Sequence, residues 1–491
     1  APADKYFEIT KNLDIFATLY KEVNTYYVDE VDPNQLIKTG INSMLESLDP
    51  YTNYIPEDDI EDYRTMTTGQ YGGIGALIGT RNGKNMIIMP YEGFPAHDAG
   101  LKIGDEIIMV DGINVKEKAY TDISKLLRGQ ANSKLNIAVR RYGKPDPIQV
   151  EMTREKITID NVQYYGMVED DIGYIKLSDF TTNAGKEVKN ALVELKEKGA
   201  SKMILDLRGN PGGLLNEAVN VSNIFIPKGS EVVSTKGKMT DWNKTYKALN
   251  PPVDTEMPLV VLTSSSSASA SEIVAGVVQD YDRGVLVGQK TFGKGLVQAT
   301  RPLTYNSQLK VTTAKYYIPS GRCIQAIDYS HRNDDGSVGK VPDSLKVAFK
   351  TRNNRTVYDG GGVDPDIVVE LEYLAPIAVS LVNTGLIFDY GTEYHYAHPT
   401  IASSRDFKLT DAEYQEFIDW LKDKDYDYTT RVENSIDDLV KVAKKEKYYE
   451  DIDEQIQSLK LKVHHNKETD LQKFKSDIKQ ILEEEISSRY Y

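Results

Sequence analysis

Several protein classes are excluded by what this chain lacks. Cys323 is the single cysteine among 491 residues, so an intrachain disulfide and a cysteine-rich zinc site are both excluded. The six histidines form no group with metal-ligand spacing, and we therefore expect no metal and no other cofactor. No stretch approaches the roughly 18 apolar residues that a membrane helix needs. The best candidate, residues 374–388, is interrupted by proline, asparagine and glycine.

Positive charge is in short supply. The chain has 59 Lys and Arg against 74 Asp and Glu, which gives a formal net charge of -15. A strong negative field argues against nucleic acid or an anionic membrane surface as partner, although solubility alone also explains it. With 40% hydrophobic and 27% charged residues the chain can bury cores, and its length suggests three or four domains.

Changes in hydrophobic period divide the chain into four predicted domains. Residues 1–68 have apolar side chains at helical spacing, and residues 69–155 contain short strands typical of a small, partly open β-barrel. Strands and helices alternate over residues 156–372, which predicts an α/β layer on a central sheet. Residues 373–491 are highly charged and helical. The expected fold is therefore a multidomain α/β protein with helical N-terminal and C-terminal segments.

Within the α/β segment the elements can be placed individually. Apolar runs predict strands at 173–177, 203–207 and 259–262, and helical periodicity predicts helices at 185–198, 214–226 and 270–281.

A serine-rich motif, Thr-Ser-Ser-Ser-Ser-Ala-Ser-Ala-Ser-Glu at residues 263–272, joins a buried strand to an apolar helix. One interpretation is a serine-rich linker with a helix-capping residue. The other is a nucleophile at a helix N-terminus, where the helix dipole favours the negative oxygen of a transition state. The motif alone leaves both interpretations open.

A glycine-rich motif at residues 288–298 contains Lys294 and Gln298. It nearly matches a phosphate-binding loop, but Gly295 replaces the Ser or Thr that would hold magnesium, and the following residues resemble a strand rather than a helix. We expect Lys294 and Gln298 to face the same side of a strand. The alternative for Lys294 is a surface lysine in a glycine-rich turn.

Lys294 is also the natural base for a serine nucleophile, because no histidine stands in a comparable strand-to-helix setting. A lysine base must be neutral, and lowering its pKa from about 10.4 to about 7.5 takes roughly 4 kcal/mol of burial and nearby positive dipole. Phe292, Leu296 and the helix N-terminus at Ala270 are the expected sources. Gln298 would orient the amine.

A third motif, Leu-Asp-Leu-Arg-Gly-Asn-Pro-Gly-Gly at residues 205–213, runs from a strand through a glycine-rich turn into a helix. Such a turn can need glycines for geometry alone. Its glycine N–H groups can also line an oxyanion hole beside the nucleophile.

Together these motifs, with Tyr-Tyr-Ile-Pro-Ser-Gly-Arg at 316–322, resemble the C-terminal processing peptidases, or tail-specific proteases. The resemblance covers most of residues 1–372. It implies a serine endopeptidase that cleaves proteins near their C-termini through a Ser-Lys dyad.

The family's site residues transfer by motif. Ser269 would be the nucleophile, Lys294 the base and Gln298 its orienting partner. The N–H of Ala270 would form the oxyanion hole with one from the 209–213 turn. That turn offers three glycines, and the sequence does not choose among them: Gly209, Gly212 and Gly213.

The segment 71–156 resembles the PDZ domain that these proteases carry, most clearly at residues 95–105. PDZ domains bind a C-terminal carboxylate in a backbone nest and add the peptide as a strand. Gly73, Ile74 and Gly75 would form that nest. The alternative is an ordinary glycine-rich entry into a strand.

The remaining expectations concern partners, location and the tail. The resemblance implies protein or peptide substrates with accessible C-termini, and it leaves a homo-oligomer open. We expect an exported protein of the periplasm or cell envelope whose signal peptide has been removed. Residues 373–491 would be an oligomerisation domain, a lid or a solvated helical cap. The alternative function is a catalytically inactive peptide-binding protein of the same fold.

Overall fold

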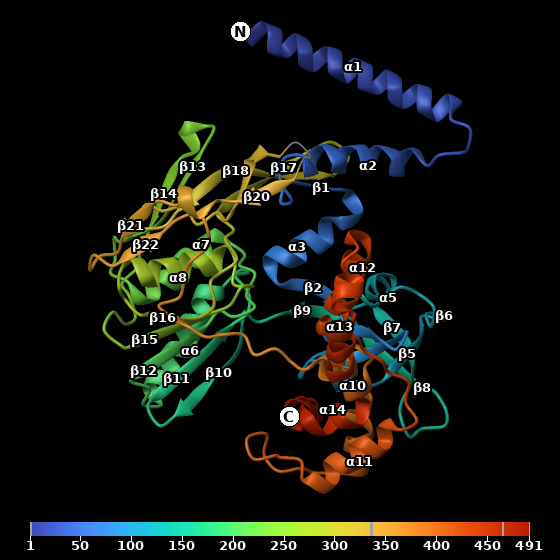
Figure 1. The fold of residues 1–491 in the computed structure, drawn as a ribbon. Helices are drawn as coiled ribbons and strands as arrows, with labels where there is room; N and C mark the ends of the chain where they lie inside the picture. The colour runs from blue at the N-terminus through green and yellow to red at the C-terminus, as the bar shows by residue number, and fades with distance from the viewer. Residues whose placement is uncertain (1, 334–336, 464–465, 491) are drawn as a thin grey trace. The chain divides into compact units, whose positions relative to one another are not determined.

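The computed structural model describes residues 2–333, 337–463 and 466–490. Contacts group the chain into two compact units, and each unit is made from two separate stretches of sequence (Figure 1). The first unit comprises residues 1–70 and 158–370, and the second comprises residues 71–157 and 371–491. The predicted multidomain α/β class is confirmed.

A six-stranded sheet forms the base of the first unit, with strand order β10-β11-β12-β15-β16-β23. Its strands from β11 to β23 run parallel, and β10 is antiparallel to β11. The central strands are apolar and buried, as expected for parallel strands covered on both faces. The strands are β10 (Val162–Glu169), β11 (Ile172–Leu177), β12 (Lys202–Asp206), β15 (Leu259–Thr263), β16 (Val285–Gly288) and β23 (Ile367–Val368).

Three helices pack on this sheet: α6 (Ala184–Glu197), α7 (Leu215–Phe225) and α8 (Ala270–Asp280). Every residue of α8 is buried. In Figure 1, α7 and α8 lie between the six-stranded sheet and a second sheet of the same unit. One continuous hydrophobic core joins all these elements.

The second sheet is antiparallel and is built around the long strand β18, which pairs with β1, β13 and β17. Its strands are β1 (Asn53–Ile55), β13 (Glu231–Gly237), β14 (Lys244–Lys247), β17 (Leu296–Pro302) and β18 (Gln308–Tyr317). Two short hairpins complete the strands of this unit: β19 (Ile327–Arg332) with β20 (Val338–Lys340), and β21 (Ala348–Lys350) with β22 (Thr356–Tyr358).

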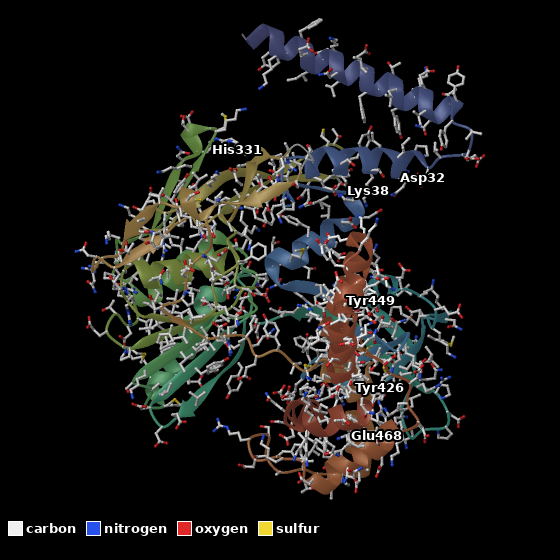
Figure 2. The ribbon with its side chains drawn as sticks, in the orientation of Figure 1. Asp32, Lys38, His331, Tyr426, Tyr449 and Glu468 are labelled. Atoms are coloured by element: carbon white, nitrogen blue, oxygen red, sulfur yellow. The ribbon has the colours of Figure 1, made fainter. Side chains whose placement is uncertain are left out.

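The first unit also carries the helices α1 (Pro2–Tyr26), α2 (Pro33–Glu46) and α3 (Ile60–Thr68). Asp32, labelled in Figure 2, caps α2 by accepting hydrogen bonds from the backbone N–H groups of Asn34 and Gln35. The Tyr20 hydroxyl donates to the Pro33 carbonyl at 2.7 Å and fixes α1 against the start of α2.

The second unit combines a small β-barrel with a helical bundle. None of the helices in the described ranges is long and apolar enough to cross a membrane. The barrel contains β2 (Gln70–Gly73), β3 (Ala76–Arg81), β4 (Lys84–Pro90), α4 (Pro95–Asp98), β5 (Glu106–Val110), β6 (Ile113–Asn114), α5 (Tyr120–Leu127), β7 (Lys134–Arg140), β8 (Ile148–Thr153) and β9 (Glu155–Thr158). The bundle contains α9 (Pro376–Asn383), α10 (Leu386–Ala397), α11 (Asp411–Leu421), α12 (Arg431–Glu446), α13 (Tyr449–Val463), α14 (Lys467–Lys473) and α15 (Lys475–Ser487).

Candidate active site

Ser269 lies at a sharp turn between β15 and α8. Its backbone has φ 55° and ψ -112°, a conformation that non-glycine residues rarely adopt. A strained residue between a buried strand and a helix is the geometry that presents the nucleophile in many hydrolases. The backbone of Ser269 is therefore strained, and its side chain lines a cavity.

Three serines of this loop have different surroundings. Ser267 is fully buried, donates to the Leu207 carbonyl at 2.8 Å and accepts from Ser264 N at 2.9 Å. Ser271 is fully buried and donates to the Asn210 carbonyl at 3.0 Å. Ser269 Oγ donates no hydrogen bond within the part of the chain that the structure describes, and it lines a cavity of about 470 Å³. Ser267 and Ser271 are thus committed to structure, whereas the Ser269 hydroxyl is available.

The 205–213 turn holds this serine loop in place. The buried Asn210 accepts through its carbonyl from Ala268 N at 3.0 Å, and its amide donates to the Leu177 carbonyl at 2.8 Å. Gly212 approaches the loop so closely that a Cβ there would lie 2.8 Å from both Ala270 N and Ser269 Cβ. Glycine is therefore required at this position for packing against the nucleophile.

The candidate oxyanion donors can be separated by their hydrogen bonds. Gly209 N donates to Ser264 Oγ at 3.1 Å, and Gly212 N donates to Asn210 Oδ1 at 2.8 Å. Gly213 and Ala270 both line the cavity, and their N–H groups have no partner among the described residues. Two backbone donors thus remain free beside Ser269.

Lys294 does not lie in a strand, so the expected geometry with Gln298 was wrong. Lys294 precedes β17, which begins at Leu296, and the β17–β18 register shifts between Val297 and Gln298. Both side chains nevertheless line the cavity that contains Ser269. The Gln298 amide donates to Thr312 Oγ1 at 3.1 Å, and the described residues show no hydrogen bond between Gln298 and Lys294.

The surroundings of Lys294 favour its neutral form. Its pKa is lowered from 10.5 to about 8, mainly by burial and also by the positive charge of Lys310, and this net value includes the opposing influence of Glu272 and Asp49. The Lys294 amine also lies 4.5 Å from the centre of the Tyr51 ring, a contact that favours the charged form. About one-tenth of the amine is therefore neutral at pH 7, far more than for an ordinary lysine, and a general base must be neutral to accept a proton.

Glu272 connects the serine loop to the lysine loop. Its fully buried carboxylate accepts from Ser269 N at 2.8 Å, Thr291 Oγ1 at 2.6 Å, Gly293 N at 2.7 Å and Lys294 N at 2.9 Å. Burial raises the pKa of this carboxyl to about 7, although these hydrogen bonds oppose the rise. No role was predicted for Glu272, yet its position three residues after Ser269 is the spacing of a capping box and could have identified it.

Tyr316 makes a second connection between the two loops. Its buried hydroxyl lies 3.1 Å from the Ser269 carbonyl oxygen and 2.5 Å from the Lys294 carbonyl oxygen. Burial raises the pKa of this phenol well above its ordinary value, so it remains a donor. The backbones of the two residues are thus held together by one buried side chain that sequence reasoning missed.

In the small barrel, the predicted carboxylate nest is the stretch Gly73-Ile74-Gly75, which consists largely of backbone. Ile74 is buried in the barrel core, and its carbonyl accepts from Ala96 N at 2.8 Å. Gly75 has φ +67°, and a Cβ there would lie 2.3 Å from Phe94 Cβ.

The described ranges contain no group of three or more metal-binding side chains. The Lys294 loop leads into strand β17 rather than a helix, so it lacks the helix N-terminus of a phosphate-binding loop.

Comparison with known proteins identifies the family of this chain. The family model described as "Peptidase family S41" matches residues 171–331, and a PDZ model matches residues 89–141. The chain is 37% identical over 321 residues to the "Carboxy-terminal-processing protease" of Bartonella bacilliformis, covering 65% of this chain and 73% of that protein. The chain belongs to the carboxy-terminal-processing proteases of peptidase family S41. It is therefore a serine peptidase with a PDZ domain, and the predicted family is confirmed.

Other relatives agree. A "Probable CtpA-like serine protease" of Staphylococcus aureus is 36% identical over 316 residues, which cover 64% of this chain and 62% of that protein. Residues 377–491 match a model described as "Probable PDZ-protease, C-terminal helical domain". Among solved structures, the "Photosystem II D1 C-terminal processing protease" is 26% identical, covering 76% of this chain and 96% of that chain with a TM-score of 0.38.

Proposed function

We propose that the chain cleaves polypeptides near their C-termini, with Ser269 as nucleophile and Lys294 as base. The observation that carries this proposal is the Ser269 hydroxyl, which donates to no group of the described residues and shares a cavity with a lysine whose pKa is lowered to about 8. The neutral amine takes the Ser269 proton as the oxygen attacks the peptide carbonyl. The resulting ammonium then protonates the leaving amine, and water hydrolyses the acyl-enzyme by the same route.

The N–H groups of Ala270 and Gly213 would stabilise the oxyanion. Both line the cavity and neither is used within the described residues, whereas Gly209 N and Gly212 N already donate elsewhere. Donors held rigidly at the site of developing charge lower the barrier because they need no reorganisation.

Gln298 would orient the lysine amine. Its Nε2 is fixed by Thr312 Oγ1 at 3.1 Å, which leaves Oε1 as its free acceptor among the described residues. An amide oxygen held in this way can accept a hydrogen bond from the Lys294 amine. The cavity that contains both side chains provides the space for this contact.

The test uses an unstructured peptide and mass spectrometry of its products. Ser269→Ala is expected to lower the rate by several orders of magnitude. Lys294→Arg is expected to be as inactive as Lys294→Ala, because arginine does not lose its proton in proteins. Ser266→Ala, an exposed position in the same loop, is the matched control and should retain activity. An active Ser269→Ala or Lys294→Arg variant would refute the assignment.

We also propose that the PDZ domain binds the substrate C-terminus through Gly73, Ile74 and Gly75. Backbone N–H groups form charge-assisted hydrogen bonds with a carboxylate, and these are about twice as strong as neutral ones. Amidation of an apolar C-terminus should therefore cost about 1.5–3 kcal/mol, or roughly ten- to a hundredfold in kcat/KM. Calorimetric binding of the acid and amide peptides to the Ser269→Ala protein isolates recognition from cleavage. Equal affinity for the two peptides would show that the domain does not recognise the carboxylate.

The N-terminal helix α1 supports association with a second copy of the chain. Six of its apolar residues follow the alternating three- and four-residue spacing of a coiled-coil seam, at positions 6, 9, 13, 16, 20 and 23. Phe7, Ile15 and Leu19 are also exposed but lie outside this seam. Tyr6 is 73% exposed and Leu13 is 65% exposed, and Figure 2 shows side chains projecting from α1 along its length. Leu13→Glu should reduce the mass measured by light scattering, whereas Thr18→Glu, outside the seam, should not.

We further propose that the protein acts in the periplasm or cell envelope, in line with its bacterial relatives. Immunoblots of fractionated cells test this location, and recovery in the cytoplasmic fraction would refute it.

A further inference from the structure

A second cavity, of about 360 Å³, adjoins the one that contains Ser269. The two cavities share Leu214, Leu215, Val297 and Gln298 as lining residues. They therefore follow one another along the start of strand β17. A polypeptide bound at the first cavity would extend past the second.

The lining of the second cavity is uncharged. None of the described residues that line it is acidic or basic, although 27% of the chain is charged. The cavity around Ser269 is different, since it includes Asp179, Lys294 and Lys310. A charged side chain entering the second cavity would lose water without gaining an oppositely charged partner from the lining, which is unfavourable.

Aromatic and sulfur-containing side chains form one wall. Met239 and Trp242 come from the connection between β13 and β14, and each is 53% exposed. The Arg301 guanidinium lies 4.5 Å from the Trp242 ring centre, and Asn243 Oδ1 accepts from Gly237 N at 2.9 Å. These contacts hold the wall in place. The volume is about twice that of a cavity of ~150 Å³ that holds benzene, so a large side chain fits.

We propose that this second cavity binds a bulky, uncharged side chain of the substrate, aromatic or aliphatic, two residues away from the side chain in the first cavity. The proposal rests on the proposed function. Side chains on one face of an extended peptide recur at every second residue, about 6.6 Å apart, so a peptide that follows β17 would direct every second side chain toward the same side as the cavities. Within the described residues β17 pairs with β18 alone, so its other edge is free to add a peptide strand.

The test uses fluorogenic peptides in which one position at a time is Phe, Gly or Glu. The position of interest is the one that lies two residues away from a residue flanking the cleaved bond. At that position wild type should prefer Phe to Gly by roughly ten- to a hundredfold in kcat/KM, because the cavity buries a large apolar side chain. Glu at that position should be cut no faster than Gly.

Two variants and a control localise the preference. Trp242→Ala removes part of the wall and should lower the Phe/Gly ratio several-fold. Ala299→Phe fills the cavity and should abolish the preference for Phe over Gly. Tyr305→Ala is the control, because Tyr305 is 92% exposed in the β17–β18 connection and does not line the cavity.

The outcomes separate this inference from the proposed function. If wild type cuts the peptides but the Phe/Gly ratio is unchanged in both cavity variants, the second cavity does not select the side chain and the inference is wrong. Equal cleavage of Glu and Phe peptides would overturn it as well. If Ser269→Ala cuts as fast as wild type, the proposed function fails instead.

Discussion

Lys294→Met should make the protein more stable at neutral pH while abolishing its activity. Methionine has a similar length but no charge to bury. In the folded protein the pKa of Lys294 is lowered from 10.5 to about 8, so the buried charge destabilises the fold whenever the amine is protonated. The environment that makes Lys294 a base is therefore also a source of instability.

The size of the effect follows from the two pKa values. Each pKa unit corresponds to 1.36 kcal/mol, so the difference between 10.5 and about 8 means that the protonated amine destabilises the folded protein by about 3 kcal/mol below pH 8. Because the amine is partly exposed, we expect a destabilisation of about 2–3 kcal/mol. Above pH 8 the folded protein loses this proton first. The destabilisation then declines to below about 1 kcal/mol at pH 10, as the unfolded chain also begins to deprotonate.

Urea unfolding at pH 7 and at pH 10 measures this difference. The chain has two tryptophans, and Trp242 is the one that lies in the first unit with Lys294. In a Trp420→Phe background, Trp242 fluorescence therefore reports the unfolding of that unit. A methionine variant that is no more stable than wild type at pH 7, or equally stabilised at both pH values, would refute the reasoning.

Three further predictions concern the same site. In stopped-flow or fluorogenic assays, kcat/KM should rise about tenfold from pH 7 to a plateau above the Lys294 pKa of about 8, and Lys310→Gln should move this rise to higher pH because a nearby positive charge is removed. Glu272→Gln should lower kcat/KM at least ~100-fold, since four donors lose a carboxylate acceptor. Gly212→Ala should abolish cleavage, because its Cβ would lie 2.6 Å from a carbonyl oxygen. Gly209→Ala should remain active, because a Cβ there meets open space, but its φ of +75° should lower the stability measured by thermal unfolding by about 1–2 kcal/mol.

A matched control and two contradicting outcomes test the predictions for Lys310 and Glu272. Lys315→Gln removes an exposed charge from the same strand as Lys310 and should leave the pH profile unchanged. A Lys310→Gln profile that coincides with wild type would show that Lys310 does not tune the base. If Glu272→Gln keeps wild-type kcat/KM, the carboxylate does not position the two loops.

The hydrophobic period of the sequence predicted the strands and helices of the α/β layer correctly, because each is either buried on both faces or buried on one face only. The strand predicted at 203–207 is Lys202–Asp206, and the helix predicted at 270–281 is Ala270–Asp280. Buried parallel strands are continuous apolar runs, and helices packed on them show a 3.6-residue period. The motif containing Ser269 was equally visible, because a hydroxyl between a buried strand and a helix is a local pattern.

The surroundings of Lys294 could not be predicted from local sequence. Phe292 was expected to bury the amine, but it is 49% exposed. Tyr51 and Lys310 are the side chains that act on the amine. The pairing of β1 with β18 brings these two side chains to the Lys294 amine. The hydrophobic pattern of the sequence near Lys294 does not indicate this pairing. The same limit explains the wrong strand assignment for Lys294, because the glycines around it end the regular structure before β17 begins.

The β1–β18 pairing has a consequence for the order in which the protease matures during synthesis. Thr52 and Thr312 are in contact although they are 260 residues apart. A ribosome adds about 5–20 residues per second, so β1 waits roughly 13–50 s for its partner strand to emerge. Throughout that interval Tyr51 has no fixed place near Lys294, and the base lacks its final surroundings. A nascent chain that ends before β18 therefore contains Ser269 and Lys294 without the strand pairing that places Tyr51 beside the lysine.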